Sequence, residues 1–487
     1  EIQGWMILIL GWVFVPFYTR SMVYTMPEFL ERRYNPQSRT ILSVISLVSY
    51  VLTKVAVTVY AGGLVFQQVF GIKELWGIDF FWIAAIGLVV LTALYTIFGG
   101  MKSVLYTSVL QTPILLLGSL IILVLGFKEL GGWDEMMRVC GAVTVNDYGD
   151  TMTNLIRSND DANFPWLGAL IGSAIIGFWY WCTDQFIVQR VLSGKNEMEA
   201  RRGTIFGAYL KLLPVFLFLI PGMIAFALHQ KYIGAGGEGF LPMLANGTAN
   251  ADAAFPTLVA KLLPAGVKGL VVCGILAALM SSLASLFNSS AMLFTIDFYK
   301  RFKPETPEKK LVGIGQIATI VIVVLGILWI PIMRSVGDVL YTYLQDVQSV
   351  LAPGIAAAFL LGICWKRTSA QGGMWGLISG MVIGLTRLGA KVYYSNAGEV
   401  ADSTFKYLFY DMNWLFFCGW MFLFCIIVVI VVSLATEAPT AEKIQGLVFG
   451  TATKEQKAAT RASWNHWDII HTVIILAITA AFYWYFW

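Results

Sequence analysis

Long apolar blocks separated by short polar breaks run through the whole chain. Most blocks are roughly 18 to 30 residues long, the length that a helix needs to cross about 30 Å of hydrocarbon at 1.5 Å per residue. The pattern predicts an all-α polytopic membrane protein in which residues 1–487 form one transmembrane domain. We expect about twelve spans, at 4–19, 41–70, 80–98, 103–127, 165–183, 204–228, 267–297, 311–332, 338–364, 372–392, 413–434 and 467–486.

Composition supports a membrane location and excludes several other classes. Hydrophobic residues make up 58% of the chain and charged residues only 13%, whereas a soluble domain carries about 25% charged residues. The formal net charge of +4 is spread over the connecting segments, so the basic cluster that a nucleic acid would require is missing. The six cysteines lack the spacing of a metal site.

The distribution of Lys and Arg predicts how the chain crosses the membrane, because these residues accumulate on the cytoplasmic side. Of the 33 Lys and Arg residues, 20 fall in one set of alternate connections, 10 in the other and three inside spans. This bias places Glu1 and Trp487 on the external side of a plasma (inner) membrane. Residues 25–34, opened by Pro27, are typical of an amphipathic helix at the membrane surface.

Polar groups inside a span are candidates for function, because each is costly in lipid unless it is paired or faces water. The end of the fifth block places Tyr180 and Trp181 directly before Asp184 and Gln185. An aromatic face can cover the apolar side of a sugar ring while neighbouring polar groups bind its hydroxyls. An aromatic belt at the membrane interface explains the same segment equally well.

The sixth block contains a lysine about seven residues from its start. Lys211 could reach back to the cytoplasmic surface, but Pro214 and Pro221 follow it. Two prolines in one span favour an irregular helix beside a cavity.

Hydroxyl groups cluster in the seventh block. Ser281 and Ser282 follow Ala278 by three and four residues. Their hydroxyls, together with a freed backbone carbonyl, could bind Na⁺. Close packing of small residues between helices is the simpler explanation and the favoured one from this segment alone.

The ninth block places Tyr341, Gln345 and Gln348 near one helical face, and Pro353–Gly354 is expected to break the helix. The Gln345 carboxamide can donate and accept hydrogen bonds at once, which suits a sugar hydroxyl. A hydrogen bond to another helix is the alternative. We find no nucleophile with a positioned base and no phosphate loop, so an enzyme is not expected.

Several of these segments together resemble the sodium/solute symporter family, most closely its sodium/glucose cotransporters and the bacterial sodium/galactose symporter. The resemblance covers nearly the whole chain. It is carried by residues 177–190, the Tyr-Leu-Lys-Leu sequence around Lys211, residues 278–299, Phe359–Gly362 and Trp365–Arg367.

The resemblance implies a LeuT-type inverted repeat of five plus five helices with additional flanking helices, and about 14 spans. Two N-terminal spans are then expected upstream of Glu1. It also implies that Tyr180 stacks on the sugar as an inner gate. The other implied solute residues are Trp181, Lys211 and Gln345 in contact with the sugar, Asp184 and Gln185 beside it, Tyr341 on its outer side, and Glu1 near a family sugar-binding Glu.

For sodium, the resemblance implies a site formed by the Ala278 carbonyl and the hydroxyls of Ser281 and Ser282. Two positions depart from the family pattern. Gly177 stands where sugar transporters usually carry Asn, Ser or Thr, and Ser108 stands where members usually have Asp. The first departure leaves the identity of the sugar open, and the second favours one Na⁺ per transport cycle.

The expected function is therefore sodium-coupled import of a glucose- or galactose-like hexose by alternating access. Na⁺, a sugar or polyol, and the lipid bilayer are the expected partners, without nucleic acid. Two rivals stay open: a sodium-coupled symporter of another solute, such as myo-inositol or an organic anion, and a sodium-gated sugar sensor or channel.

Overall fold

The computed structural model describes residues 3–23, 25–244, 247–336, 339–397 and 401–486, and it consists almost entirely of helices. In the described part, the strands are β1 (Glu74–Leu75) and β2 (Ile78–Asp79), which pair antiparallel in one short hairpin. Several helices contain wider π-helical segments, labelled η. Such segments keep every backbone group bonded while they shift the side chains that follow, and they are frequent at functional sites.

The first part of the chain contains two of these π-helical segments. The helix predicted for residues 25–34 is confirmed at Met26–Arg33, and Thr25 caps its start by accepting a hydrogen bond from the backbone N–H of Glu28 at 3.2 Å. The elements are α1 (Gly4–Ile9), η1 (Leu10–Phe14), α2 (Val15–Ser21), α3 (Met26–Arg33), α4 (Pro36–Ser49), η2 (Tyr50–Val55), α5 (Ala56–Phe70) and α6 (Phe80–Leu130).

The middle of the chain contains the irregular helix that the proline pattern indicated and a second interruption, at the aromatic segment, which was not predicted. The irregular sixth span is confirmed, since a π-helical segment separates its two halves. The elements are α7 (Trp133–Gly141), α8 (Trp166–Gly177), η3 (Phe178–Thr183), α9 (Gln185–Leu192), α10 (Glu197–Pro214), η4 (Val215–Leu219), α11 (Ile220–Gly234), the short 3₁₀ helix η5 (Ala251–Ala253) and α12 (Ala254–Leu262).

The last part of the chain consists mostly of long helices joined by short ones. The elements are α13 (Ala265–Met292), η6 (Leu293–Tyr299), α14 (Lys300–Phe302), α15 (Glu308–Val336), α16 (Leu340–Cys364), α17 (Ala370–Asn396), α18 (Thr404–Lys406), η7 (Tyr407–Asp411), α19 (Trp414–Ala435), α20 (Ala441–Ile444), α21 (Lys454–Ala462) and α22 (His466–Tyr485).

Nine helices in the described ranges are long and apolar enough to cross a membrane, or ten if the bent pair Gly4–Ser21 and Met26–Arg33 counts as one span. Two other predicted spans are helical but fall short of that test: Phe80–Leu94 is only a short apolar helix, and α17 is not among the nine. The total of twelve spans therefore stays a prediction.

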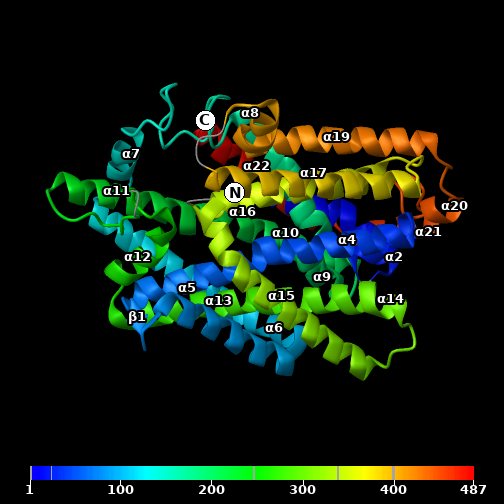
Figure 1. Ribbon diagram of the computed structural model, residues 1–487, viewed down its shortest axis with the longest axis horizontal. Coiled ribbons are helices and arrows are strands. Elements are labelled where there is room, and N and C mark those ends of the chain that lie inside the picture. The colour runs from blue at the N-terminus through cyan, green and yellow to red at the C-terminus, as the bar shows by residue number, and fades with distance from the viewer. Residues whose placement is uncertain (1–2, 24, 245–246, 337–338, 398–400, 487) are drawn as a thin grey trace.

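The connecting elements gather at the two ends of the bundle. Figure 1 shows α7, α12 and β1 at one end and α14, α20 and α21 at the other. Segments predicted to share a side of the membrane thus lie at the same end. Glu1 and Trp487, the two residues predicted to be external, lie outside the described residues.

One predicted helix break is absent from the described backbone, and another, between the spans 80–98 and 103–127, is not decided. Residues 80–130 carry one continuous helix assignment, α6, but β1 and α7, which flank it, lie at the same end of the bundle (Figure 1). The break expected at Pro353–Gly354 is wrong, because α16 continues through both residues. In lipid the backbone groups freed by a break must find new hydrogen-bond partners, so a helix continues through a proline instead of unwinding there.

Glycines bring α16 and α17 together at the backbone. A Cβ atom on Gly354 would lie 3.0 Å from the Cα of Gly380, and one on Gly384 would lie 2.2 Å from the carbonyl oxygen of Val350. Small residues at such positions let helix backbones approach closely. The helices α16, α17 and α19 pack on one another and form the upper part of the bundle in Figure 1.

Candidate functional site

The helix that carries the aromatic residues is interrupted at Asp184. This residue lies between η3 and α9 with extended backbone angles, φ −80° and ψ 126°. Its carboxylate accepts a hydrogen bond from the backbone N–H of Phe186 at 3.1 Å, which caps the start of α9. Interrupted helices are the means by which transporter folds expose polar groups in the middle of a membrane.

Lys54 and Tyr50 of η2 meet Asp184 at this interruption. The Lys54 ammonium forms an ion pair with the Asp184 carboxylate, and the Tyr50 hydroxyl donates to the same carboxylate at 3.0 Å. Lys54 is 9% exposed and Asp184 is 4% exposed. The Lys54 ammonium also lies over the rings of Phe186 and Tyr180, at 4.2 and 5.2 Å from their centroids. The pair therefore anchors the aromatic segment to η2.

The sequence showed Lys54 only as a charged residue within a span, so its role was missed. No residue of opposite charge lies one helical turn from it in η2. Its partner is 130 residues away. Only the burial of a lysine in an apolar block could have marked it as paired.

Trp181 and Lys211, which were each predicted to contact the solute, lie side by side, and Gln3 joins them. The Lys211 ammonium is 5.7 Å from the centroid of a Trp181 ring. The Trp181 indole N–H donates to the side-chain oxygen of Gln3 at 3.2 Å, and the Gln3 amide donates to the Ser173 carbonyl at 3.1 Å. Gln3 was missed by the sequence analysis, since it precedes the first apolar block and has no distinguishing motif.

Gly177 leaves the space that Gln3 occupies. A Cβ atom at Gly177 would lie 3.2 Å from both Cδ and Oε1 of Gln3. The departure from the family pattern at Gly177 thus makes room for the side chain of Gln3, the residue before α1, which supplies a carboxamide beside Trp181.

The remaining predicted solute residues differ in their surroundings. The Gln345 side chain is partly buried on α16, which packs against η3, and within the described ranges it forms no hydrogen bond. Tyr341 is 39% exposed near the start of the same helix. Gln185 is buried, and its side-chain oxygen accepts from the Met26 backbone N–H at 2.8 Å. Glu1 lies outside the described residues.

The predicted sodium residues lie within α13, which is uninterrupted from Ala265 to Met292. The Ala278 carbonyl is therefore not freed by a break, although a helical carbonyl keeps a second lone pair for an ion. The hydroxyls of Ser281 and Ser108 are 2.5 Å apart. Ser108 thus lies directly beside the candidate sodium residues, where a carboxylate would change the charge around an ion.

Comparison with known proteins identifies the class of molecule. The description "Sodium:solute symporter family" matches residues 2–380. The chain belongs to this family. It is a sodium-coupled transporter rather than an enzyme, and it is a multi-pass membrane protein.

Individual relatives agree with that assignment. The symporter is 35% identical to a sodium/mannose cotransporter of Bos taurus over 99% of this chain and 83% of the relative. It is 37% identical to sodium/glucose cotransporter 1 of Ovis aries over 89% of this chain and 67% of the relative. It is 35% identical to sodium/myo-inositol cotransporter 2 of Homo sapiens over 93% and 68%, respectively.

A solved structure supports the fold. The symporter matches the structure of a Na⁺-coupled sialic acid symporter with a TM-score of 0.69 and 21% identity, over 90% of this chain and 84% of that one. This likeness confirms the LeuT-type helical fold that the resemblance implied.

Proposed function

We propose that this symporter imports a glucose- or galactose-like hexose together with Na⁺ by alternating access. The observation that carries the proposal is the grouping of Tyr180 and Trp181 with the ammonium of Lys211 and the carboxamide of Gln3 at an interrupted helix. Aromatic faces beside amide and ammonium donors suit a ring that is apolar on its faces and polar at its edge. The sodium/mannose, sodium/glucose and sodium/myo-inositol relatives support the same class of solute.

The solute site is assigned as follows. Tyr180 stacks on the ring, Trp181 contacts it through its aromatic face because its N–H is taken by Gln3, and polar atoms of Lys211, Gln345 and Gln3 bind hydroxyls. Asp184 and Gln185 border the site and hold its walls, through Lys54 and Met26 respectively. Tyr341 covers the outer side, and Glu1 adds a carboxylate acceptor.

Sodium binds at the Ala278 carbonyl and at the hydroxyls of Ser281 and Ser282. Neutral oxygen ligands suit Na⁺ because they replace its hydration shell. With Ser108 in place of a carboxylate, one Na⁺ crosses in each cycle. One charge moving through about 100 mV contributes roughly 2.3 kcal/mol, and a tenfold Na⁺ gradient adds about 1.4 kcal/mol. Such a carrier can concentrate its solute at most several hundredfold.

Coupling follows from which conformation each ligand stabilises. Na⁺ entering from outside stabilises the outward-open state and completes the solute site, and a rocking motion then exposes both ligands to the cytoplasm. The symporter acts in the lipid bilayer of the plasma (inner) membrane, with both chain ends outside and without a nucleic-acid partner.

Uptake of labelled hexose into liposomes tests the proposal. An inward Na⁺ gradient should drive accumulation above the external concentration, and a K⁺ gradient should not. Ser282→Ala should weaken the Na⁺ dependence, whereas Ser290→Ala, which removes a buried hydroxyl elsewhere on α13, should not. Uptake that is normal and Na⁺-driven in Ser282→Ala would remove the sodium-site assignment.

Two other results would redirect the proposal. Stronger competition by myo-inositol than by any hexose would assign a polyol substrate, which the myo-inositol relative makes the second candidate. Competition by an organic anion, without competition by any hexose or by myo-inositol, would exclude both the hexose and the polyol as substrates. A Na⁺ current without solute accumulation would indicate a sensor or channel.

A further inference from the structure

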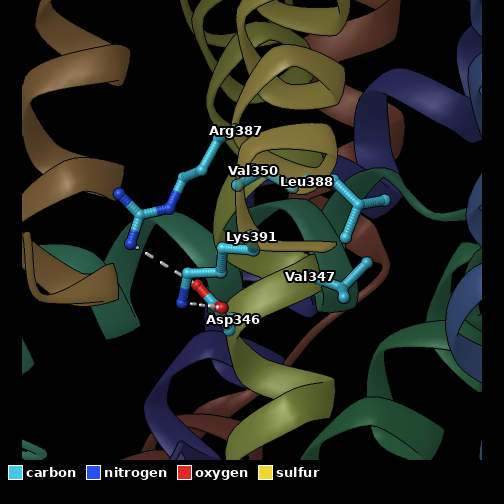
Figure 2. A pocket seen from close by; sticks show the side chains of 6 residues that line it. All are labelled: Asp346, Val347, Val350, Arg387, Leu388 and Lys391. Atoms are coloured by element: carbon cyan, nitrogen blue, oxygen red, sulfur yellow. Dashed lines mark hydrogen bonds and ion pairs between the residues drawn. The ribbon is translucent and has the colours of Figure 1, made fainter. Parts of the chain in front are cut away.

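A buried charged group lies beside Gln345 and has no part in the solute or sodium sites assigned above. Asp346 follows Gln345 on α16 and forms an ion pair with Lys391 of α17. Arg387, one turn earlier on α17, places a guanidinium nitrogen 3.7 Å from the other carboxylate oxygen. Figure 2 shows both cationic side chains reaching toward Asp346, at a small pocket also lined by Val347, Val350 and Leu388.

The ion pairs of Asp346 lie at one end of the close contact between α16 and α17. Along the two helices, this contact pairs Gly354 with Gly380, Val350 with Gly384, and Asp346 with Arg387 and Lys391. The α16 residues recur every fourth position, so they form one face of the helix. The backbones touch at the first two contacts, and the ion pairs hold the same face at the third.

Arg387 also connects this face to the segment that precedes α19. Its guanidinium donates to the carbonyl oxygens of Leu408, at 3.3 Å, and Met412, at 2.7 Å. It lies 4.1 Å from the ring centroid of Phe417 in α19, and its side chain is fully buried. A cation held at so many points cannot follow Asp346 if α16 moves, so Asp346 is held to a fixed position.

The direction of Gln345 follows from that restraint. Adjacent residues of an α-helix point about 100° apart. Because Asp346 is held against α17, the Gln345 side chain is turned away from α17 by a set angle. The helix α16 also packs against η3, which carries Tyr180 and Trp181.

We propose that Asp346, Lys391 and Arg387 are positioning residues that fix the rotation of α16 and so aim the Gln345 carboxamide at the solute. The inference rests on the proposed function, because it takes Gln345 as a solute ligand. Without the Asp346 charge, Arg387 and Lys391 would lie one turn apart on α17 with no anion between them, and this flank of α16 would lose the attraction that holds it to α17.

The test measures hexose uptake in liposomes at saturating Na⁺. Asp346→Asn and Lys391→Met should each raise the solute KM about tenfold, with little change in the Na⁺ concentration that gives half-maximal uptake. Asp402→Asn is the control, because Asp402 pairs with Lys406 at 2.9 Å but is 95% exposed. It should leave the solute KM unchanged.

Two combined variants separate positioning from a general loss of stability. Asp346→Lys with Lys391→Asp restores opposite charges and should recover most of the lost affinity. In a Gln345→Ala background, Asp346→Asn should cost little further affinity, because the carboxamide that it positions is gone. Thermal unfolding of each purified variant identifies any protein that fails to fold, and Lys391→Met, which leaves Asp346 paired with Arg387, is the milder substitution.

Specific outcomes overturn the inference. They are an unchanged solute KM in both Asp346→Asn and Lys391→Met, a charge exchange that recovers nothing in a folded protein, or an Asp346→Asn effect that adds in full to that of Gln345→Ala. Failure of the proposed function is distinguishable, since it would appear in the unmodified protein as uptake that does not depend on Na⁺.

Discussion

The Lys54 ammonium and the Asp184 carboxylate form a buried ion pair, although 130 residues separate them in the chain. The pair holds the interrupted segment, with Tyr180 and Phe186, against η2. Because Asp184 also caps α9, a single carboxylate joins the start of one helix to the side chain of another. The shape of the candidate solute site depends on this junction.

Removing one partner of this pair should destabilise the symporter and stop transport. A buried charge left without its partner costs about 3–5 kcal/mol, so Lys54→Met and Asp184→Asn should each lower the free energy of unfolding by about this amount and abolish most uptake. The double variant Lys54→Met with Asp184→Asn should recover stability but not transport. Thermal unfolding and liposome uptake measure the two effects. Full uptake in either single variant would contradict a role for the pair in the site.

Adding a methyl group at Gly177 should weaken solute binding. Gly177→Ala places a Cβ atom 3.2 Å from the Gln3 carboxamide, which must then shift from Trp181. We expect a loss of about 1 kcal/mol, or a roughly fivefold higher solute KM, with an unchanged response to Na⁺. Gly203→Ala is the matched control in a helix, since a Cβ atom there meets nothing within 4 Å. Equal KM values for the two variants would exclude Gln3 from the site.

A carboxylate at position 108 should strengthen sodium binding. The Ser108 hydroxyl is 2.5 Å from that of Ser281, so Ser108→Asp would bring a negative charge next to the proposed sodium ligands. The Na⁺ concentration for half-maximal uptake should fall several-fold, because an opposite charge in a region of low dielectric stabilises the bound cation. Ser108→Asn, of equal size but uncharged, should not produce this fall. The same decrease in both variants would show that size rather than charge acts here.

Asp252 holds the start of α16 from a distant segment. Both of its carboxylate oxygens accept from the Leu340 backbone N–H, each at 3.1 Å, and α16 has no cap from its own N-cap residue, Val339. Asp252→Asn keeps an acceptor and should preserve uptake. Asp252→Leu should lower the unfolding free energy by about 1 kcal/mol, as for the loss of a helix cap. Thermal unfolding at neutral pH compares the two variants, and equal stability would contradict the capping role.

The same carboxyl group should make stability depend on pH. Burial raises the pKa of Asp252 above its ordinary value of 3.8, so the folded protein binds this proton more tightly than the unfolded chain. The part of the stability that comes from this tighter proton binding, which is separate from the cap hydrogen bonds, is then full below about pH 4 and is lost as the pH rises through the raised pKa. Asp252→Asn should remove this part of the pH dependence. An unchanged pH profile of thermal unfolding in Asp252→Asn would show that another group is responsible.

The sequence alone determined the class of fold and most of the transmembrane helices. A bilayer requires each spanning segment to bond its backbone internally and to present apolar side chains, and this requirement leaves a local signal in blocks such as 338–364 and 413–434. The same local signal overestimated the break at Pro353, because in lipid an uninterrupted helix avoids the cost of exposed backbone groups.

Only the tertiary structure decided which polar groups meet. Asp184 and Trp181 could be selected from the sequence because polar or aromatic residues in unusual numbers are visible locally. Their partners Lys54 and Gln3 could not. A buried charge or amide pairs with whichever polar group the folded helices bring within a few ångströms. That proximity depends on how the helices pack, and the order of residues along one segment does not reveal the packing.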